Sequence, residues 1–342
     1  MSDVEPHGST AGPALPLGVT CASLGVLGSA AVPSLARRAA ELGYRSFWAA
    51  EANGTEAFSV LGAAGASARL DLGTGVIPVQ LRTPPLAAMG AATLQGLVPD
   101  RDVLLGVGAS SPAVVQQWHG ADLGDRPVAR MREYVALVRE CLSGETVTFD
   151  GDFWSVPRFR LAQRLARTPR LVVAALGPRM LRLAGEVADG VLLNYLPAGH
   201  VGWSVRHVRA GEQEAGRPAG SCTIYAYVHV GVCDRDEVLG EIARWWQVQE
   251  REWKALSGRI MEMPPPDRLL LEPEKLRGKI EEPSLRLEQL ELVDGSTTWR
   301  RLATHPADSF VRRLPDLVPK LRSRRAQDML QVLVVASAGE GR

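Results

Sequence analysis

Short apolar runs alternate with amphipathic stretches along most of this 342-residue chain. Nearly all of the runs are continuous rather than alternating, which is typical of parallel strands buried on both faces. The stretches between them have helical periodicity, as in repeated βα units. The predicted strands lie at 15–20, 46–51, 70–79, 103–108, 171–176, 190–195, 223–232 and 329–336. Eight such units favour a closed (β/α)₈ TIM barrel, with a doubly wound open sheet as the alternative.

The predicted helices occupy the intervals between these strands. They lie at 31–42, 56–68, 84–97, 127–142, 178–187, 199–215, 235–256 and 308–324, with a further helix beginning at Pro112. Two stretches interrupt the rhythm. Residues 143–169 contain a hairpin pattern whose turn is Asp150-Gly151. Residues 258–306 are rich in proline and charge, so we expect an insertion before the last βα unit that serves as a lid, as a dimer contact or as a poorly ordered segment. We expect one barrel domain over 1–342, with 1–14 as a flexible N-terminal tail.

Composition narrows the class of partner. Lysine and arginine (39) nearly balance aspartate and glutamate (38), and no basic stripe is evident, so we expect no nucleic-acid partner. No run of 18 apolar residues exists and the N-terminus does not read as a signal peptide, so we expect no membrane span and a cytoplasmic protein. The cysteines Cys21, Cys141, Cys222 and Cys233 form no CxxC or Cys/His cluster. We expect them to be reduced and buried, with no metal site.

Two predicted strands end in loops that open a helix directly. In GVGASSP (106–112), Gly106 and Gly108 allow the backbone to approach a ligand closely. Ser110 or Ser111 can cap the next helix. A glycine-rich loop before a helix N-terminus suits phosphate. The alternative is an ordinary structural βα loop.

The second such loop is AALGPRM (174–180), where Gly177-Pro178 opens a helix and Arg179 adds a charge able to pair with phosphate. The alternative is a tight turn with a solvated arginine. A third strand, LDLGTGVIPV (70–79), carries internal glycines, which mark either a bulge beneath a ligand or close packing in the barrel. The GxGxxG and GxxxxGK[ST] fingerprints are absent, which argues against a Rossmann unit and an NTPase.

Candidates for acid–base chemistry are few. Glu51 is the last residue of the predicted strand that ends in WAAE. The alternative role for Glu51 is a surface carboxylate just past the strand. His119 follows the helix that begins at Pro112, where a backbone hydrogen bond is the simpler role. No Ser-His-Asp order, Cys-His order or Gx-Ser-x-Gly elbow is present.

Five segments together resemble the luciferase-like monooxygenase superfamily, and within it the branch of coenzyme F420-dependent oxidoreductases found mainly in actinobacteria. They are ELGYRSFWAAE (41–51), LDLGTGVIPVQLRTP (70–84), LLGVGASSPAVVQQWHG (104–120), REYVALVRECLSGETVTFDGDFW (132–154) and LVVAALGPRMLRLAGEVADGVLLN (171–194). The resemblance runs from about residue 15 to 255 and resumes weakly over 308–336.

This resemblance implies a barrel that holds a flavin or deazaflavin in the mouth at its C-terminal face. It places a bulge with a non-proline cis peptide at Gly75–Val76 under the ring, and Glu51 beside the ring. The phosphate-bearing tail is expected at the Ser110-Ser111 loop and at the helix start after Gly177. The expected cofactor-binding residues are Thr74, Gly75, Val76, Gly106, Gly108, Ser110, Ser111, Ala175, Leu176, Gly177, Pro178, Arg179, Met180 and Asn194.

We therefore predict an oxidoreductase that transfers a hydride between reduced F420 and a small organic metabolite, with Glu51, water or His119 as the proton source. Sugar-phosphate dehydrogenases of the superfamily have an acid followed by histidine where this chain has Glu51-Ala52, and a glutamate where it has Ala109. Both differences argue against sugar-phosphate oxidation. The alternatives are an FMN-dependent monooxygenase using oxygen and a catalytically degenerate barrel that only binds a cofactor or a partner protein. Relatives are often dimers, so we expect a homodimer.

Overall fold

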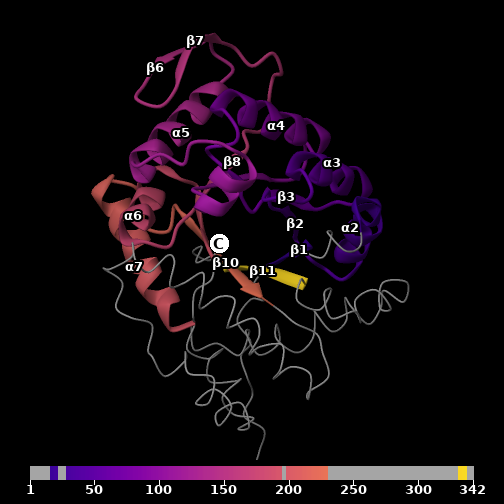
Figure 1. Cartoon of the computed structure of the whole chain (residues 1–342). Helices are drawn as coiled ribbons and strands as arrows, with labels where there is room; N and C mark the ends of the chain where they lie inside the picture. The colour runs from indigo at the N-terminus through magenta and orange to yellow at the C-terminus, as the bar shows by residue number, and fades with distance from the viewer. Residues whose placement is uncertain (1–15, 22–27, 195–197, 230–329, 337–342) are drawn as a thin grey trace, which may run out of the picture.

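The computed structural model describes residues 16–21, 28–194, 198–229 and 330–336. Its central element is a ring of eight strands, shown at the centre of Figure 1. The strands are β1 (Leu17–Cys21), β2 (Ser46–Ala49), β3 (Asp71–Thr74), β5 (Val103–Gly108), β8 (Arg170–Ala174), β9 (Gly190–Leu193), β10 (Thr223–His229) and β11 (Leu330–Ala336). Each pairs with the next, and β11 pairs with β1, so the sheet closes on itself. The predicted barrel is confirmed.

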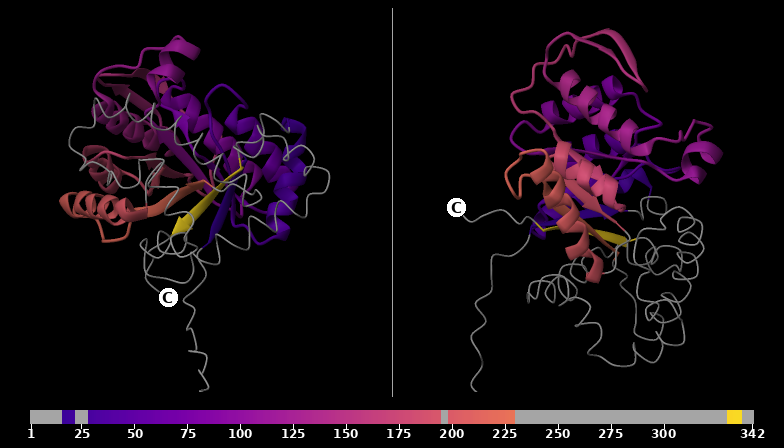
Figure 2. Two further views of the ribbon diagram at one scale, coloured as in Figure 1. Left: turned by 60° about the horizontal axis from the view of Figure 1, so that its bottom comes forward. Right: turned by 90° about the vertical axis from the view of Figure 1, so that its left-hand side faces the viewer.

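The last strand differs from the prediction in direction. Strands β1 to β10 of the ring pair in parallel, whereas β11 is antiparallel to both β1 and β10 (Figure 2). A continuous apolar run records burial on both faces and carries no information on direction, which is why the sequence pattern could not reveal this. The expected segments 1–14, 235–256, 258–306 and 308–324 lie outside the described residues.

Helices surround the ring in an arc from α2 to α7 (Figure 1). They are α2 (Val32–Glu41), α3 (Ala57–Ser67), α4 (Pro84–Leu97), α5 (Pro127–Leu142), α6 (Pro178–Val187) and α7 (Ala198–Glu214), with a short 3₁₀ turn at Ser29–Ala31. The helix expected from Pro112 is a π-helix over Ala113–Trp118. The expected hairpin is β6 (Val147–Asp150) with β7 (Ser155–Phe159), and its turn spans 151–154.

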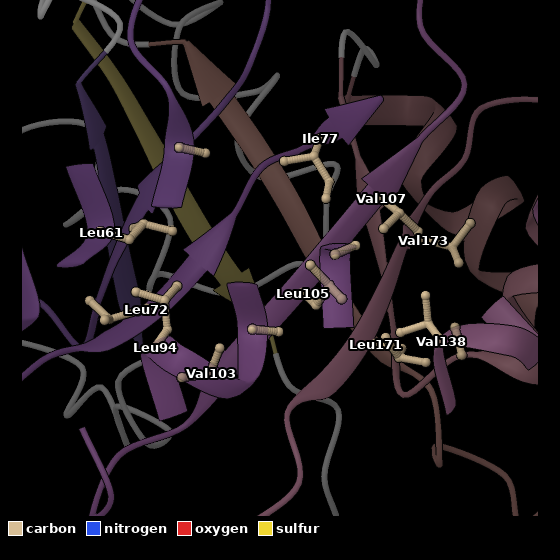
Figure 3. Close-up of a cluster of buried hydrophobic side chains, with 14 of the residues drawn as sticks. Leu61, Leu72, Ile77, Leu94, Val103, Leu105, Val107, Val138, Leu171 and Val173 are labelled. Atoms are coloured by element: carbon tan, nitrogen blue, oxygen red, sulfur yellow. The ribbon is translucent and has the colours of Figure 1, made fainter. Parts of the chain in front are cut away.

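Alternate residues of each strand face two separate cores. Outward side chains such as Leu105, Val107, Leu171 and Val173 pack under the helices (Figure 3). A smaller cluster lies inside the ring and contains Trp48, Leu104, Val172, Leu192 and Tyr225. Because both faces of β2, β5 and β9 are covered, these strands read as unbroken apolar runs.

Ionic contacts lie at the N-terminal ends of β3 and β5. Asp71, which starts β3, accepts from Arg45 Nε at 2.5 Å and lies 3.7 Å from Arg101 Nε. Arg167 pairs with Asp102 at 3.1 Å just before β5. These pairs lie at the N-terminal end of the strands, opposite the C-terminal end where the active sites of this fold lie.

Candidate active site

The predicted site residues converge at the C-terminal ends of the strands, which parallel pairing brings to one end of the barrel. The interior side chains become more accessible toward this end. Trp48 and Val172 are buried, whereas Val76, Ala174 and Asn194 beyond them are only half-buried. We call this end of the barrel the mouth. Its floor consists of small or half-exposed side chains above a packed interior.

The third strand carries a bulge at the mouth. Gly73 pairs with Leu104 and Ile77 with Val107, so four steps along one strand match three along its neighbour. The expected strand 70–79 is therefore divided into β3 and β4 (Ile77–Pro78). The Gly75–Val76 peptide is cis, as the resemblance implied.

Two backbone hydrogen bonds attach this bulge to the end of β2. Gly75 N–H donates to the Ala49 carbonyl at 2.8 Å, and Glu51 N–H donates to the Val76 carbonyl at 3.1 Å. Gly75 and Val76 are both half-buried, and a Cβ at Gly75 would lie 3.3 Å from the Trp48 ring. The bulge is thus a fixed part of the floor.

Gly106 and Gly108 lie in close contact with the bulge of the neighbouring strand. A Cβ at Gly106 would lie 1.9 Å from the carbonyl oxygen of Thr74, and one at Gly108 would lie 2.7 Å from the Val76 side chain. Thr74 itself is buried and donates its hydroxyl to the Gly106 carbonyl at 2.7 Å. The sequence indicated a close approach correctly. The group that approaches in the structure is the Thr74–Val76 bulge, and the approach of a ligand to these glycines stays a prediction.

Glu51 lies at the mouth as expected, but its carboxylate is fully engaged. Arg82 binds it through two hydrogen bonds, Nη2 to Oε1 at 2.7 Å and Nε to Oε2 at 3.0 Å. Ala57 N–H at the start of α3 donates to Oε1 at 3.1 Å. The side chains of Glu51 and Arg82 are only 13% and 18% exposed. This arrangement suits a structural clamp better than a proton donor, because a carboxylate in a bidentate ion pair acts as an acceptor.

Arg82 extends the clamp to a second acid. It also donates to Glu56, the cap of α3, and lies over the Phe58 ring at 4.8 Å. Its hydrogen bond to Glu51 raises the pKa of Arg82, so the guanidinium stays charged. Sequence reasoning did not single out Arg82 or Glu56. The available signal was an arginine two residues before a helix that begins with proline, in a chain with a lone acid after an apolar strand.

Tyr134 on α5 is a second residue that sequence reasoning missed. It is fully buried, and its hydroxyl has no hydrogen-bond partner among the described residues. Burial raises its pKa, although the charge of Arg82 opposes that shift. Its ring packs edge-on against Trp154 at 5.3 Å. A neutral phenol therefore lies near the Glu51–Arg82 pair, on the helix side of the mouth.

His119 connects two loops of the mouth. Its Nε2 lies 2.5 Å from the Ala52 carbonyl oxygen, directly after Glu51, and the residue is exposed. The backbone hydrogen bond that the sequence offered as the simpler role is present. Trp118 beside it is 54% exposed.

The Ser110-Ser111 loop lies after β5 at the same end. Ser111 Oγ accepts from Val114 N–H at 3.4 Å, so it caps the π-helix as expected. Ser110 is half-buried and Ser111 exposed. This loop therefore uses part of its donor and acceptor capacity internally.

The loop after β8 has a different character. Ala175 is buried and bonded to β9, while Leu176, Gly177, Pro178 and Met180 are half-buried. Gly177 is the N-cap of α6, and no side chain caps this helix.

Arg179 is exposed, and it has no hydrogen bond or ion pair to any residue that the structure describes. The start of α6 thus offers a cationic side chain and N–H donors, a combination that suits an anion.

The described ranges contain no group of three or more His, Cys, Asp or Glu side chains able to hold a metal ion. Within the same ranges, no helix is both long and apolar enough to cross a bilayer. Cys141 and Cys222 are buried free thiols, as predicted. Burial raises their pKa values to about 11 and about 12, so both stay protonated near neutral pH.

A (β/α)₈ barrel with a bulged third strand and a cationic helix start at its mouth is the class of protein that the geometry defines. A family model described as luciferase-like monooxygenase matches residues 22–286. The chain belongs to this family.

Curated relatives match over part of their length. The 5,10-methylenetetrahydromethanopterin reductase of Methanolobus tindarius is 32% identical over 177 residues, which are 51% of this chain and 52% of that protein. The F420-dependent glucose-6-phosphate dehydrogenase of Nakamurella multipartita is 34% identical over 162 residues, which are 46% and 48%. The chain spans about half the length of the curated relatives it matches.

Solved structures support the fold. An F420-dependent secondary alcohol dehydrogenase in complex with an F420–acetone adduct aligns with a TM-score of 0.66 at 17% identity, covering 91% of this chain and 100% of that one. The coenzyme F420-dependent tetrahydromethanopterin reductase of Methanopyrus kandleri aligns with a TM-score of 0.61 at 20% identity, covering 90% and 91%. At these identities the likeness shows the fold alone.

Proposed function

We propose that the protein is an F420-dependent oxidoreductase that transfers a hydride between the reduced deazaflavin and a small organic metabolite in the cytoplasm. The observation that carries the proposal is the uncapped start of α6 with Arg179, which has no partner among the described residues, beside a mouth floored by half-exposed residues. Relatives whose names specify F420 support the choice of cofactor. We also propose that two copies of the chain form a homodimer.

The residues present fit an anionic, planar cofactor. Arg179 and the first N–H groups of α6 would hold the phosphate of the tail, with the Ser110-Ser111 loop as a second contact. Gly75 and Val76 would support one face of the ring, because they form a half-exposed and doubly hydrogen-bonded floor. When bound, the deazaflavin supplies the carbon that delivers or accepts the hydride.

The protein's remaining role is to hold this floor and to manage a proton. Glu51 fixes the bulge through its N–H and fixes the start of α3 through its carboxylate. Because that carboxylate is paired with Arg82, we propose that water rather than Glu51 supplies the proton. His119, whose ring already bonds to the Ala52 carbonyl, would hold the rim of the mouth.

The substrate class is an unsaturated or imine-containing metabolite. Sugar phosphates are disfavoured, because Ala52 and Ala109 stand where the sugar-phosphate dehydrogenases of the superfamily have histidine and glutamate. Because the family is named for monooxygenases, the second candidate function is a monooxygenase that uses reduced FMN and oxygen. The third candidate is a barrel that binds a cofactor or a partner protein without catalysing a reaction.

Parallel titration of the purified protein with F420 and with FMN tests the proposal. We expect micromolar binding of F420 and much weaker binding of FMN. The reverse ranking would overturn the choice of cofactor. Oxidation of reduced F420 in the presence of any acceptor from the proposed class would exclude the barrel without turnover.

A further inference from the structure

A groove lies on the outer surface of the barrel between α5 and α6, which are neighbours in Figure 1. Its volume is about 580 Å³, within the usual range for sites that bind small molecules. We call it the α5–α6 groove. The residues that line it are Arg132, Val135, Ala136 and Arg139 of α5, Glu186 and Val187 of α6, Asp189 before β9, and Arg217 after α7.

The α5–α6 groove is separate from the mouth. The helix α6 begins at the mouth, and the groove lies beside its last two residues, Glu186 and Val187. At 1.5 Å per residue, Glu186 is about 10 Å further along the helix axis than Arg179. Asp189 directly precedes β9, so the groove lies toward the N-terminal ends of the strands. A ligand in the groove and a cofactor in the mouth would therefore occupy different sites.

The two carboxylates of the groove already have hydrogen-bond donors at each oxygen. Arg132 binds both oxygens of Glu186 through Nη1 and Nη2. The hydrogen bond from Arg132 lowers the pKa of Glu186, although burial opposes that shift. Asp189 accepts from Arg139 Nη2 at 2.9 Å and from Leu171 N–H at 2.7 Å. Both carboxylates are thus compensated within the protein, and they offer little to a cationic ligand.

The guanidinium groups of the groove have donors to spare. Each guanidinium carries five N–H donors. Arg217 uses Nη1 to bind the Gly185 carbonyl at 2.5 Å, and it forms no ion pair with any residue that the structure describes. Arg139 uses Nη2 for both Asp189 and the Val187 carbonyl. With three guanidinium groups and two carboxylates, the groove has a formal charge of +1 and an excess of donors.

The position of Arg217 is fixed by the helices around it. Arg217 is half-buried, and its backbone N–H donates to the Glu212 carbonyl at 2.8 Å. Its side chain binds Gly185 in the last turn of α6, where helix carbonyls lack helical partners. α6 and α7 pack closely here, because a Cβ at Gly185 would lie 2.0 Å from the Val208 carbonyl oxygen. A guanidinium held in this way loses little freedom when it binds an anion.

The lining between the charged groups is apolar. Arg132 and Arg139 are two helical turns apart on α5, which is about 10 Å. Val135, which is buried, and Ala136, which is exposed, lie between them, and Val187 of α6 adds to the same lining. An apolar lining with a few placed polar groups is the usual composition of a small-molecule site.

We infer that the α5–α6 groove binds a small monocarboxylate with an apolar body. The ligand carboxylate accepts hydrogen bonds from the spare donors of Arg217, and the apolar body covers Val135 and Ala136. A monoanion matches the formal charge of +1, whereas a phosphate ester carries about −1.5 to −2 at neutral pH. The alternative is that the charged residues only join α5 to α6 and to the segment after α7.

Calorimetric titration of the full chain without cofactor tests the inference, with benzoate as the probe. We expect benzoate to bind with a dissociation constant on the order of 1 mM or lower. Benzyl alcohol, which has the same ring without the charge, should not bind measurably. Arg217→Gln keeps an N–H donor for the Gly185 carbonyl but removes the charge, so it should weaken benzoate binding at least about tenfold. Arg182→Gln, at an exposed arginine of α6 outside the groove, is the matched control and should bind benzoate as wild type does.

A second pair of variants tests the apolar lining and guards against misfolding of the first. Ala136→Glu places a carboxylate in the groove at an exposed helical position, and it should abolish benzoate binding. Ala129→Glu makes the same change at an exposed position of the same helix outside the groove, and it should retain binding. Circular dichroism establishes that all variants are folded.

Three results would overturn the inference. They are the absence of saturable benzoate binding by wild type, equal binding of benzyl alcohol, and binding that survives both Arg217→Gln and Ala136→Glu. Arg179→Ala at the mouth should leave benzoate binding unchanged, and a loss confined to that variant would place the ligand in the mouth instead. Failure of F420 binding would leave these results unchanged, since no cofactor is present in the measurement.

Discussion

The two sides of the barrel mouth differ in how their polar groups are used. On the side of β2, β3 and β5, Glu51, Arg82 and His119 bind to other parts of the protein. On the side of β8, α6 begins without a side-chain cap and Arg179 has no partner within the described ranges. The first side is a rigid frame, and the second offers free donors to a ligand.

Two loops of similar sequence have different surroundings on the two sides. Both 106–112 and 174–180 combine glycine, a helix start and a strand end, which suits a phosphate. In the first, the glycines make room for the Thr74–Val76 bulge and Ser111 caps the helix. In the second, no side chain of the described residues caps the helix. Variants on the first side should therefore lower stability, and variants on the second should lower affinity.

The largest effect should come from Gly106→Ala. The added methyl group would lie 1.9 Å from the Thr74 carbonyl oxygen, so the bulge must move. We expect the free energy of unfolding to fall by about 3 kcal/mol, the upper end of the range for overpacking. Urea denaturation measures this free energy.

Gly54→Ala, in a loop of the mouth where nothing lies within 4 Å of the new atom, is the control and should stay within about 0.5 kcal/mol of wild type. Equal effects at both positions would refute the framing role of Gly106.

Arg82→Ala should have the next largest effect. It leaves the mostly buried Glu51 carboxylate without its bidentate partner, and removes the contact with the Phe58 ring. We expect the free energy of unfolding, measured by urea denaturation, to fall by about 2 kcal/mol. A buried carboxylate that loses its hydrogen-bond donors is no longer compensated for its removal from water. Arg82→Lys should restore only part of the lost stability, since an ammonium group cannot donate the two parallel hydrogen bonds that the guanidinium makes to the Glu51 carboxylate. The exposed pair of Arg69 with Asp100 provides the control, because Arg69→Ala should change stability by less than about 0.5 kcal/mol. If Arg82→Ala is as mild as this control, the clamp does not frame the mouth.

The smallest effect concerns pH. Burial raises the pKa of Glu56, but hydrogen bonds from Ser59 and Phe58 and the charge of Arg82 together lower it below 4.5. The stability that Glu56 contributes is therefore present above pH 4.5 and is lost as the pH falls through the lowered folded-state value. The difference in unfolding free energy between wild type and Glu56→Gln should shrink between pH 6 and pH 3.

Arg179, on the side of the mouth next to β8, provides the comparison for this pH dependence. The stability difference between wild type and Arg179→Ala should not change with pH over the same interval, because Arg179 binds no carboxylate in the described structure. Denaturation curves at several pH values give both differences. A constant difference for Glu56→Gln would show that its carboxylate has no ionic role in the frame.

The sequence was sufficient for the barrel because burial on both faces leaves a direct record in continuous apolar runs. Trp48 and Phe47 face different cores, yet both must be apolar. An apolar run does not show whether a strand is parallel or antiparallel to its neighbours, so the direction of β11 could not be predicted. Glycines at 75, 106 and 108 indicated close approach, but the neighbour that approaches is set by pairing between strands that lie some 30 residues apart in the chain.

The site was predictable where a residue acts through its place on a strand end and not where it acts through a distant partner. Glu51 was found at the end of an apolar run. Its partner Arg82 lies 31 residues further along, and only the closed barrel brings the two together. Arg179 was found because a charge beside a Gly-Pro helix start is a local pattern. Tyr134 has no local signal, since its burial is set by the packing of α5.

A thermodynamic cycle on Arg179 tests whether the open side of the mouth binds the phosphate of F420. It combines wild type and Arg179→Ala with two ligands, F420 and its phosphate-free deazaflavin core, in equilibrium titrations. We expect Arg179→Ala to weaken F420 by about 1–3 kcal/mol, roughly 5- to 150-fold, and to leave the affinity for the core nearly unchanged. Arg182→Ala, one turn further along α6, should change neither affinity. An equal loss for both ligands, or no loss for F420, would show that Arg179 does not hold the phosphate.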